Sequence, residues 1–249
     1  MEFDDRRYFY RKDIRIADWL MSFRDKLIEE YLAYHPDYQT TFSKGRPLSL
    51  AHNNSSFKDW KMDWIKIIYP GSNSYVDPDN HPFPEIPAAL PTASHIAREL
   101  GKHCEFLGYS TIDPHAVIER HTDPRSGNEH TKVRIHVPLI IPEGDVWFET
   151  ESEEMDWSDL WAFNNQYIHS AYNKTDLRRL TLLVDVDREF LGLNNATPYD
   201  EQRMIREFNK PYYHVFKDRD EVSKYQFYPD GTWKLFKLTK EEYENESNK

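Results

Sequence analysis

The 249-residue chain has little of what several protein classes need. Its single cysteine, Cys104, excludes a disulfide within the chain and favours a reducing compartment. The eight glycines include no Gly-rich phosphate-binding loop. No apolar run approaches the roughly 20 residues that cross a bilayer, and the amino-terminal stretch lacks the apolar segment of a signal peptide. We therefore expect a cytoplasmic protein without a membrane partner.

Basic residues are outnumbered by acidic ones. Acidic residues number 43 and basic residues 32, which gives a net charge of −11. Nucleic acid is not expected as a partner, because phosphate binding requires a basic face, although a local basic pocket is compatible with this balance. Hydrophobic residues make up 39% and aromatic residues 15% of the chain, enough for a sizeable core. The length fits one large domain or one domain with appendages.

The amino-terminal part of the chain predicts two helices. The first covers residues 13–34, with apolar residues spaced by three and four and Asp13 as its N-cap. The second covers residues 93–106, with Thr92 as its cap and Cys104 facing inward. Between them we expect a polar, broken stretch over 36–60, a strand over 64–68 and a long surface loop over 69–91.

From residue 107 onward the sequence is typical of short strands separated by Pro, Gly, Asn and Asp. Such spacing favours an antiparallel sandwich or jelly roll, so the expected fold class is mainly β with flanking helices. The expected strands are 106–112, 116–122, 131–140, 145–150, 158–163, 166–172 and 178–187.

This pattern divides the chain into two expected regions. Residues 1–190 form a helical amino-terminal region and a β domain with its core at about 106–190. Residues 191–249 form an extension with a helix near 198–208 and an aromatic hairpin turning at Asp230-Gly231, packed on the core. The oligomeric state is left open.

A possible metal site begins at His121-Thr122-Asp123. On a strand, positions i and i+2 share a face, so His121 and Asp123 present an imidazole and a carboxylate to one side. A distant histidine such as His169 completes a 2-His-1-carboxylate triad, which holds non-haem Fe(II) and leaves one face open. Taken alone, His121 and Asp123 fit a surface strand end equally well.

Three further residues could line the same pocket. Arg179 follows His169 by ten positions, and its planar fork suits a dicarboxylate such as 2-oxoglutarate. Arg134 and His136 share one face of their strand, which lies either inside the pocket or on a salt-bridged outer surface. Arg178 must point away from Arg179, so only one of these two arginines can reach a common pocket.

The stretch from Ser110 to Val186 resembles the aspartyl/asparaginyl β-hydroxylase family, 2-oxoglutarate- and Fe(II)-dependent dioxygenases that include proline hydroxylase-like members. Ser110 lies eleven residues before His121, as a family serine does before its first iron-binding histidine. Three segments carry the rest of the resemblance: an Arg-x-His strand (VRIHVPL, 133–139), a second-histidine segment (FNNQYIHSAYN, 163–173) and a closing strand (RRLTLLVD, 178–185).

This resemblance implies a fold and an activity. The fold is a double-stranded β-helix, a cupin-like jelly roll with its site at the open mouth. His121, Asp123 and His169 bind Fe(II); Arg179 and Ser110 hold the far carboxylate of 2-oxoglutarate; Arg134 and His136 line the pocket. The implied activity is O2-dependent hydroxylation of an amino-acid side chain, free or in a peptide or protein.

Two alternatives remain. The first is a jelly-roll binding module that holds an acidic ligand without turnover. The second is a cupin-like metalloenzyme that does not use 2-oxoglutarate. Neither needs a buried arginine ten residues beyond the second histidine.

Overall fold

The computed structural model describes residues 2–39, 60–68, 75–121, 129–150, 153–155, 157–198, 212–215, 220–227 and 233–247. The chain divides into two compact units. The first comprises Met1–Thr150 and Glu154–Pro198, and the second comprises Glu151–Glu153 and Tyr199–Lys249. Each unit is described by itself below.

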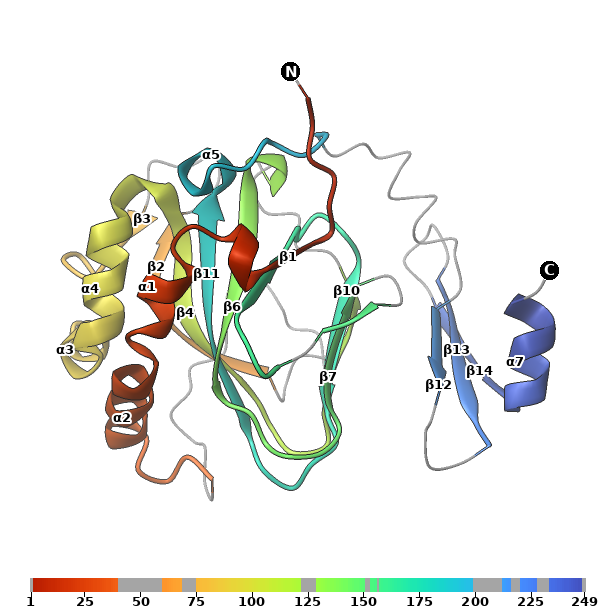
Figure 1. Ribbon diagram of the computed structural model, residues 1–249. Helices are drawn as coiled ribbons and strands as arrows, with labels where there is room; N and C mark the ends of the chain where they lie inside the picture. Colours follow the sequence, from red (N-terminus) through yellow and green to blue (C-terminus); the bar gives the residue numbers. More distant parts are fainter. Residues whose placement is uncertain are drawn as a thin grey trace. The chain divides into compact units, whose positions relative to one another are not determined.

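The first unit is built on a double-stranded β-helix, as its sequence predicted (Figure 1). One antiparallel sheet contains the strands β9 (Trp161–Phe163), β6 (Lys132–Ile140), β11 (Arg179–Asp187) and β4 (Cys104–Ile112), in that order. The facing sheet contains β5 (Ala116–His121), β10 (His169–Asn173), β7 (Val146–Thr150) and β8 (Glu153–Glu154). The chain crosses repeatedly between the two sheets, which makes the fold a jelly roll.

Three more strands widen the first sheet to seven. β1 (Tyr8–Tyr10) pairs with β9 at one edge. At the other edge β2 (Trp60–Ile68) pairs with β4, and β3 (Tyr75–Val76) pairs with β2. We call this seven-stranded sheet the large sheet and its four-stranded partner the small sheet.

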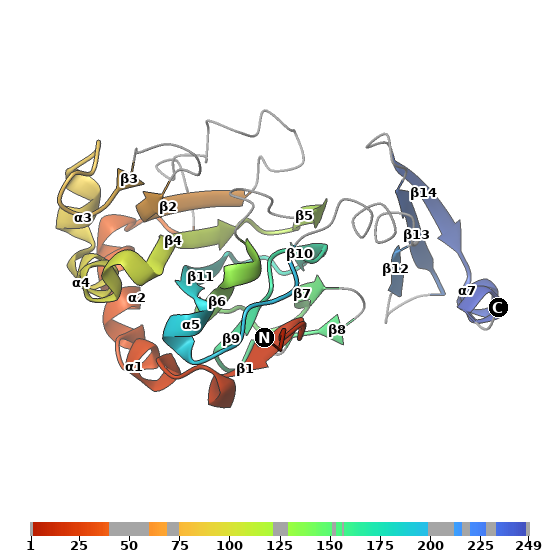
Figure 2. The ribbon, with the colours of Figure 1, turned by 90° about the horizontal axis from the view of Figure 1, so that it is seen from above.

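Helices cover the face of the large sheet that is turned away from the small sheet (Figures 1 and 2). The reason is the alternation of side chains along the strands: Val133, Ile135 and Val137 are fully buried in the core cluster that includes residues of these helices. The helices are α1 (Ala17–Met21), α2 (Arg24–Tyr34), α3 (Glu85–Ala89), α4 (Pro91–Leu100) and the short α5 (Arg188–Leu191), with 3-10 turns η1 (Arg11–Asp13), η3 (Gly101–His103) and η4 (Glu129–Thr131).

The predicted helix over 13–34 is wrong in its continuity. Asp13 ends the turn η1, and the helix is divided into α1 and α2 at Ser22 and Phe23. The Ser22 hydroxyl donates to the Trp19 carbonyl at 2.6 Å, a local hydrogen bond that competes with the helical pattern.

The predicted helix over 93–106 is too long at its carboxyl end. It begins at Pro91, whose fixed φ suits the first helical position, and ends at Leu100. Gly101 then adopts a φ of 49°, a region that favours glycine, and turns the chain into β4. Cys104 is buried as expected, but as the first residue of β4.

The prediction of one long loop over 69–91 is also wrong in part. Its described part contains β3 and α3, and Ile86 and Pro87 of α3 are buried. Apolar residues in a Pro-rich segment can therefore form a short helix when a sheet face is available to bury them.

The second unit contains a three-stranded antiparallel sheet and a helix. The strands are β12 (Tyr212–Val215), β13 (Val222–Phe227) and β14 (Trp233–Leu238), and the helix is α7 (Lys240–Ser247). β13 and β14 pair with Phe227 across from Trp233, at the place of the predicted hairpin. Its turn at Asp230-Gly231 and the predicted helix at 198–208 lie outside the described residues. That the extension packs on the core stays a prediction.

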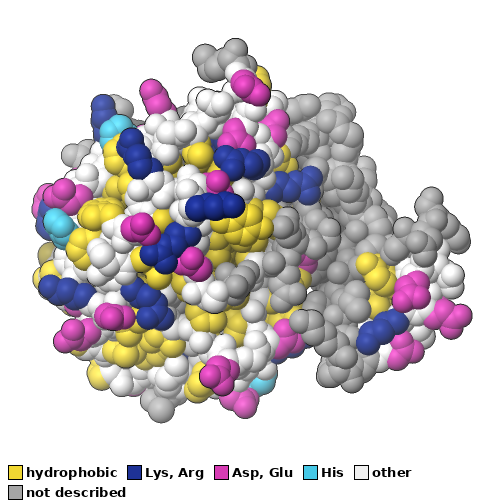
Figure 3. Space-filling view, viewed as in Figure 1, with side chains coloured by type: hydrophobic (Ala, Val, Ile, Leu, Met, Phe, Trp, Pro, Cys, Tyr) yellow, Lys and Arg dark blue, Asp and Glu magenta, His cyan; other side chains and the backbone are white. Residues whose placement is uncertain are grey.

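The surface of the first unit carries charges of both signs. On the face seen in Figure 3, acidic and basic side chains alternate with apolar ones. Within the described ranges, no helix combines the length and apolar composition needed to cross a bilayer.

Candidate active site

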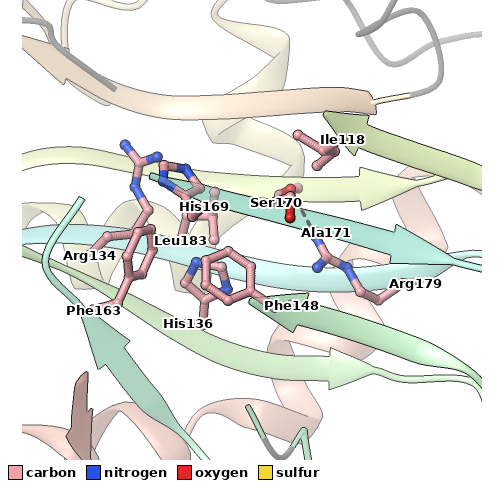
Figure 4. A pocket seen from close by; sticks show the side chains of 11 residues that line it. Ile118, Arg134, His136, Phe148, Phe163, His169, Ser170, Ala171, Arg179 and Leu183 are labelled. Atoms are coloured by element: carbon pink, nitrogen blue, oxygen red, sulfur yellow. Dashed lines mark hydrogen bonds between the residues drawn. The ribbon is translucent and has the colours of Figure 1, made fainter. Parts of the chain in front are cut away.

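A pocket lies between the inner faces of the two sheets (Figure 4). Alternation on β6 and β11 sends the apolar residues under the helices and turns Arg134, His136, Arg179 and Leu183 toward the small sheet. Arg134 and His136 therefore lie inside the pocket and not on an outer surface, the two possibilities that the sequence left open. The pocket is lined by Ser110, Ile118, Arg134, His136, Phe148, Phe163, His169, Ser170, Ala171, Arg179 and Leu183.

Arg179 is a buried cation at one end of this pocket (Figure 4). Its side chain is 2% exposed, and no described carboxylate pairs with it. Nη2 donates to the Ser110 hydroxyl at 3.5 Å, whereas Nε and Nη1 have no hydrogen-bond partner among the described residues. Burial lowers the pKa of Arg179 to about 9. A charged guanidinium with unused donors is a site for an anion.

The neighbouring Arg178 is engaged elsewhere. Its Nε donates to the Asp113 carboxylate at 2.7 Å, and its Nη1 donates to the Tyr38 carbonyl. It is not among the residues that line the cavity. Of the two adjacent arginines, Arg179 reaches the pocket.

His169 lies on the small sheet toward the other end of the pocket (Figure 4). Its Nδ1 donates to the Tyr167 carbonyl at 2.9 Å. Because a carbonyl only accepts hydrogen bonds, this contact places the ring proton on Nδ1, so Nε2 is the unprotonated nitrogen of the neutral ring. Such a hydrogen bond is what orients metal-binding histidines.

The strand pairing aligns the two expected metal-binding histidines. His169 at the start of β10 is the register partner of His121 at the end of β5. A one-residue irregularity between Ile118 and His121 produces this alignment, since Ala171 is the partner of Ile118. The register therefore brings the backbone of these two positions directly opposite each other.

The third expected ligand, Asp123, lies outside the described residues, as does the side chain of His121. Among the residues whose side chains the structure describes, no three His, Cys, Asp or Glu residues form a group that could hold a metal ion. The iron-binding set therefore stays a prediction.

Arg134 makes a buried ion pair that sequence analysis did not single out. Its Nε and Nη2 donate to the two carboxylate oxygens of Asp185, each at 2.7 Å. The two residues are register partners on β6 and β11. Asp185 lies six residues beyond Arg179 on the same face of its strand, so the alternation carried a signal that could have identified it.

Aromatic rings form one wall of the pocket. The His136 ring stacks on Trp161 with centroids 4.2 Å apart, and Phe148 and Phe163 meet it edge-on. Trp157 lies against Arg179, whose Cζ is 4.8 Å from the ring centroid. Trp157 precedes β9 in an irregular segment, and no periodic pattern in the sequence indicates where its ring lies.

The architecture is that of a cupin-like jelly roll with cationic and hydroxyl groups gathered inside it. A family model described as aspartyl/asparaginyl β-hydroxylase matches residues 26–189, well over half of the chain. The chain belongs to the aspartyl/asparaginyl β-hydroxylase family and is a hydroxylase of the 2-oxoglutarate-dependent class, as the motifs between Ser110 and Val186 predicted. The match also includes most of α2 and all of β2, upstream of these motifs.

Solved structures of low identity are similar to parts of this chain. An oxidoreductase of the 2OG-Fe(II) oxygenase family from Burkholderia pseudomallei is 13% identical, covers 56% of this chain and 72% of its own, and has a TM-score of 0.37. A prolyl-4-hydroxylase from Pseudomonas putida is 14% identical, covers 67% and 86%, and has a TM-score of 0.37. A cupin-superfamily sugar phosphate isomerase from Silicibacter pomeroyi is 15% identical, covers 73% and 88%, and has a TM-score of 0.26. No curated protein sequence matches the chain.

Proposed function

We propose that this protein hydroxylates an amino-acid side chain, free or within a peptide or protein, with Fe(II), 2-oxoglutarate and O2. Family membership supports the reaction class. The observation that carries the use of 2-oxoglutarate is the buried Arg179, with two nitrogens lacking hydrogen-bond partners among the described residues.

Arg179 fits the far carboxylate of 2-oxoglutarate. An isolated buried cation is costly, and a carboxylate ligand provides both the opposite charge and acceptors for its unused N–H groups. The Ser110 hydroxyl, 3.5 Å from Nη2, lies beside this position and supplies a further hydrogen bond. Together these two residues would hold the cosubstrate at one end of the pocket.

His121, Asp123 and His169 would hold Fe(II) at the other end. The hydrogen bond from His169 Nδ1 to the Tyr167 carbonyl supports this role, because it orients the ring and makes Nε2 the unprotonated nitrogen that a metal would bind. With 2-oxoglutarate and O2, such an iron centre supplies the oxidation that puts one oxygen atom into a C–H bond and the other into succinate, with release of CO2.

His136 and Arg134 would line the same pocket and contact the metal-bound end of the cosubstrate or a substrate carboxylate. The aromatic wall fixes the His136 ring, and Asp185 fixes the plane of the Arg134 guanidinium. The buried rings give this wall an apolar surface, and charge interactions beside such a surface are stronger than in bulk water.

The cosubstrate site is tested by anaerobic absorption spectroscopy and calorimetry on the purified protein. Addition of Fe(II) and 2-oxoglutarate should produce a metal-to-ligand absorption band. Arg179→Ala should weaken 2-oxoglutarate binding by roughly 30- to several-thousand-fold with Fe(II) binding nearly intact, because a buried charge pair loses one partner. Arg179→Lys keeps the charge but loses the planar fork, so its effect should be intermediate.

Arg178→Ala is the matched control. It removes the ion pair with Asp113 and should lower thermal stability while leaving 2-oxoglutarate affinity unchanged. An unchanged affinity in Arg179→Ala, or a larger loss in Arg178→Ala, would contradict the assignment.

The metal site is tested by anaerobic Fe(II) titration of His169→Ala. Loss of a ligand should abolish tight iron binding while the unfolding transition remains cooperative. Iron affinity equal to that of the wild type would rule out His169 as a ligand.

The substrate class is tested by turnover. Succinate formation with Fe(II), ascorbate and O2 should be stimulated by some members of a panel of free amino acids and peptides. If no member stimulates it and no absorption band forms, a binding module without turnover becomes the better description.

A further inference from the structure

The indole of Trp157 covers the guanidinium of Arg179. The Cζ atom of Arg179 lies 4.8 Å from the centroid of the Trp157 ring, and both side chains are more than nine-tenths buried. A cation near the face of an aromatic ring is attracted to its quadrupole, and tryptophan gives the strongest such contact. The attraction is greatest where water is excluded, as it is here.

This contact matters because other described groups hold Arg179 only weakly. Its hydrogen bond to Ser110 is long at 3.5 Å, and Nε and Nη1 have no partner. A long side chain with two of its three guanidinium nitrogens unbonded loses its orientation easily. An aromatic face restrains the guanidinium from one side while its N–H groups, which lie in the guanidinium plane, stay available to a ligand.

Packing, rather than hydrogen bonding, sets the orientation of the indole itself. Trp161 meets Trp157 edge-on with centroids 5.1 Å apart, and Phe148 does so at 6.3 Å. The Trp157 Nε1 is buried and has no hydrogen-bond partner among the described residues. A buried unpaired N–H is unfavourable, so the ring contacts must outweigh it.

We propose that Trp157 is a positioning residue that holds Arg179 ready to bind the far carboxylate of 2-oxoglutarate. The ring contributes its face to the guanidinium and makes no hydrogen bond to the ligand. This inference rests on the proposed function, because it assigns Trp157 a role only through Arg179.

The test measures 2-oxoglutarate binding to the full-length protein by anaerobic calorimetry, with Fe(II) affinity and thermal unfolding recorded for each variant. Trp157→Leu should weaken binding by roughly thirtyfold, equivalent to about 2 kcal/mol. Trp157→Phe keeps a ring face but has no N–H, so it should lie within a few-fold of the wild type. Trp147→Leu is the control, since it also removes a buried indole, but one that stacks on Tyr172 of the small sheet.

A double-mutant cycle separates positioning from general packing. In an Arg179→Ala background, Trp157→Leu should cause no further loss of affinity, because the ring then has no cation to hold. If Trp157→Leu does not fold, the same cycle is run with Trp157→Tyr and Trp157→Phe. Their 2-oxoglutarate affinities should differ from the wild type by a few-fold when Arg179 is present and not at all when it is absent.

The pH dependence gives a readout that packing alone would not change. The ring face favours the charged guanidinium, so the alkaline loss of 2-oxoglutarate affinity should begin at lower pH in Trp157→Leu than in the wild type. Tyr38 also acts on Arg179, but burial raises the pKa of Tyr38 above its ordinary value of 10.0. Tyr38 therefore stays uncharged over the pH range in which Arg179 loses its proton.

Two results would overturn the inference while leaving the proposed function intact. One is wild-type affinity in Trp157→Leu. The other is equal loss in Trp157→Phe and Trp157→Leu, which would assign the effect to the indole N–H. Failure of the proposed function looks different, because then Arg179→Ala itself would bind 2-oxoglutarate as the wild type does.

Discussion

Arg179 carries its charge at neutral pH although its side chain is buried, because burial lowers its pKa only to about 9. In the ligand-free protein this charge is offset by a ring face and a long hydrogen bond. A carboxylate ligand therefore gains an interaction that water cannot replace, and the affinity of the site depends on the protonation state of one side chain.

This dependence predicts how binding changes with pH. The guanidinium is charged below its pKa, so 2-oxoglutarate affinity should be constant near pH 7–8 and fall as the pH rises through about 9, by roughly tenfold per pH unit beyond it. Calorimetric titrations between pH 7 and 10.5 measure this directly. A flat profile across that range would show that the carboxylate does not depend on Arg179.

A buried polar network joins α2 to the large sheet. The Tyr31 hydroxyl on α2 donates to the Asp63 carboxylate on β2 at 3.0 Å and lies 3.2 Å from the Thr111 hydroxyl on β4. His35, just beyond α2, contacts the same Asp63 oxygen through Nε2 at 2.9 Å. Burial, followed by the charge of Asp63, raises the pKa of Tyr31 well above its ordinary value. Polar groups buried in this way orient a helix as well as stabilise it.

Tyr31→Phe should lower the free energy of unfolding by about 1–3 kcal/mol, because Asp63 loses a donor that water cannot replace. Urea denaturation measures the change. Tyr10→Phe is the control: its side chain is 52% exposed, and the expected effect is within about 0.5 kcal/mol. Equal stability of the two variants would mean that the network contributes little.

The close approach of β2 to β4 depends on Gly108. A Cβ atom at this position would lie 2.9 Å from the Trp64 Cα and 3.1 Å from the Asp63 carbonyl oxygen. Both neighbours are backbone atoms, so the strands themselves would have to move. The pairing of β2 with β4 is already irregular between Trp64 and Lys66.

Gly108→Ala should therefore destabilise the protein by about 1–3 kcal/mol. This loss should outweigh the stabilisation that alanine gives by lowering the conformational entropy of the unfolded chain. Thermal and urea unfolding should agree on the direction. A neutral or stabilising effect would show that β2 can shift without loss of its pairing.

At the scale of the whole molecule, the described residues that line the pocket all belong to the first unit. That unit has its own core, formed between the helices and the large sheet. The second unit has a separate three-stranded sheet. The candidate site therefore requires no described residue after Pro198.

A chain that ends after Pro198 should unfold cooperatively and bind Fe(II) and 2-oxoglutarate with affinities within a few-fold of the full-length protein. Calorimetry and circular dichroism on the shortened and full-length proteins measure this. Loss of cosubstrate binding in a shortened chain that still folds would assign part of the site to residues 199–249.

The sequence by itself determined the kind of fold and much of the pocket lining. A period of two in short segments predicts strands. A strand with one apolar and one polar face packs its apolar face on a core and turns its polar face to solvent or to a polar pocket. Strand patterning and residue chemistry identified Arg134, His136, His169 and Arg179, and the family resemblance added Ser110. The structure places all five around one pocket. The family motifs rest on the same segments.

Only the tertiary structure decided which partners these residues have. Asp185 next to Arg134, the Trp157 ring on Arg179 and the pairing of β1 with β9 all join segments far apart in the chain. Such contacts depend on strand register, bulges and irregular segments, which leave no periodic signal in the sequence. The inward direction of Arg134 and His136 was likewise decided by the helices, because they bury the other face of β6.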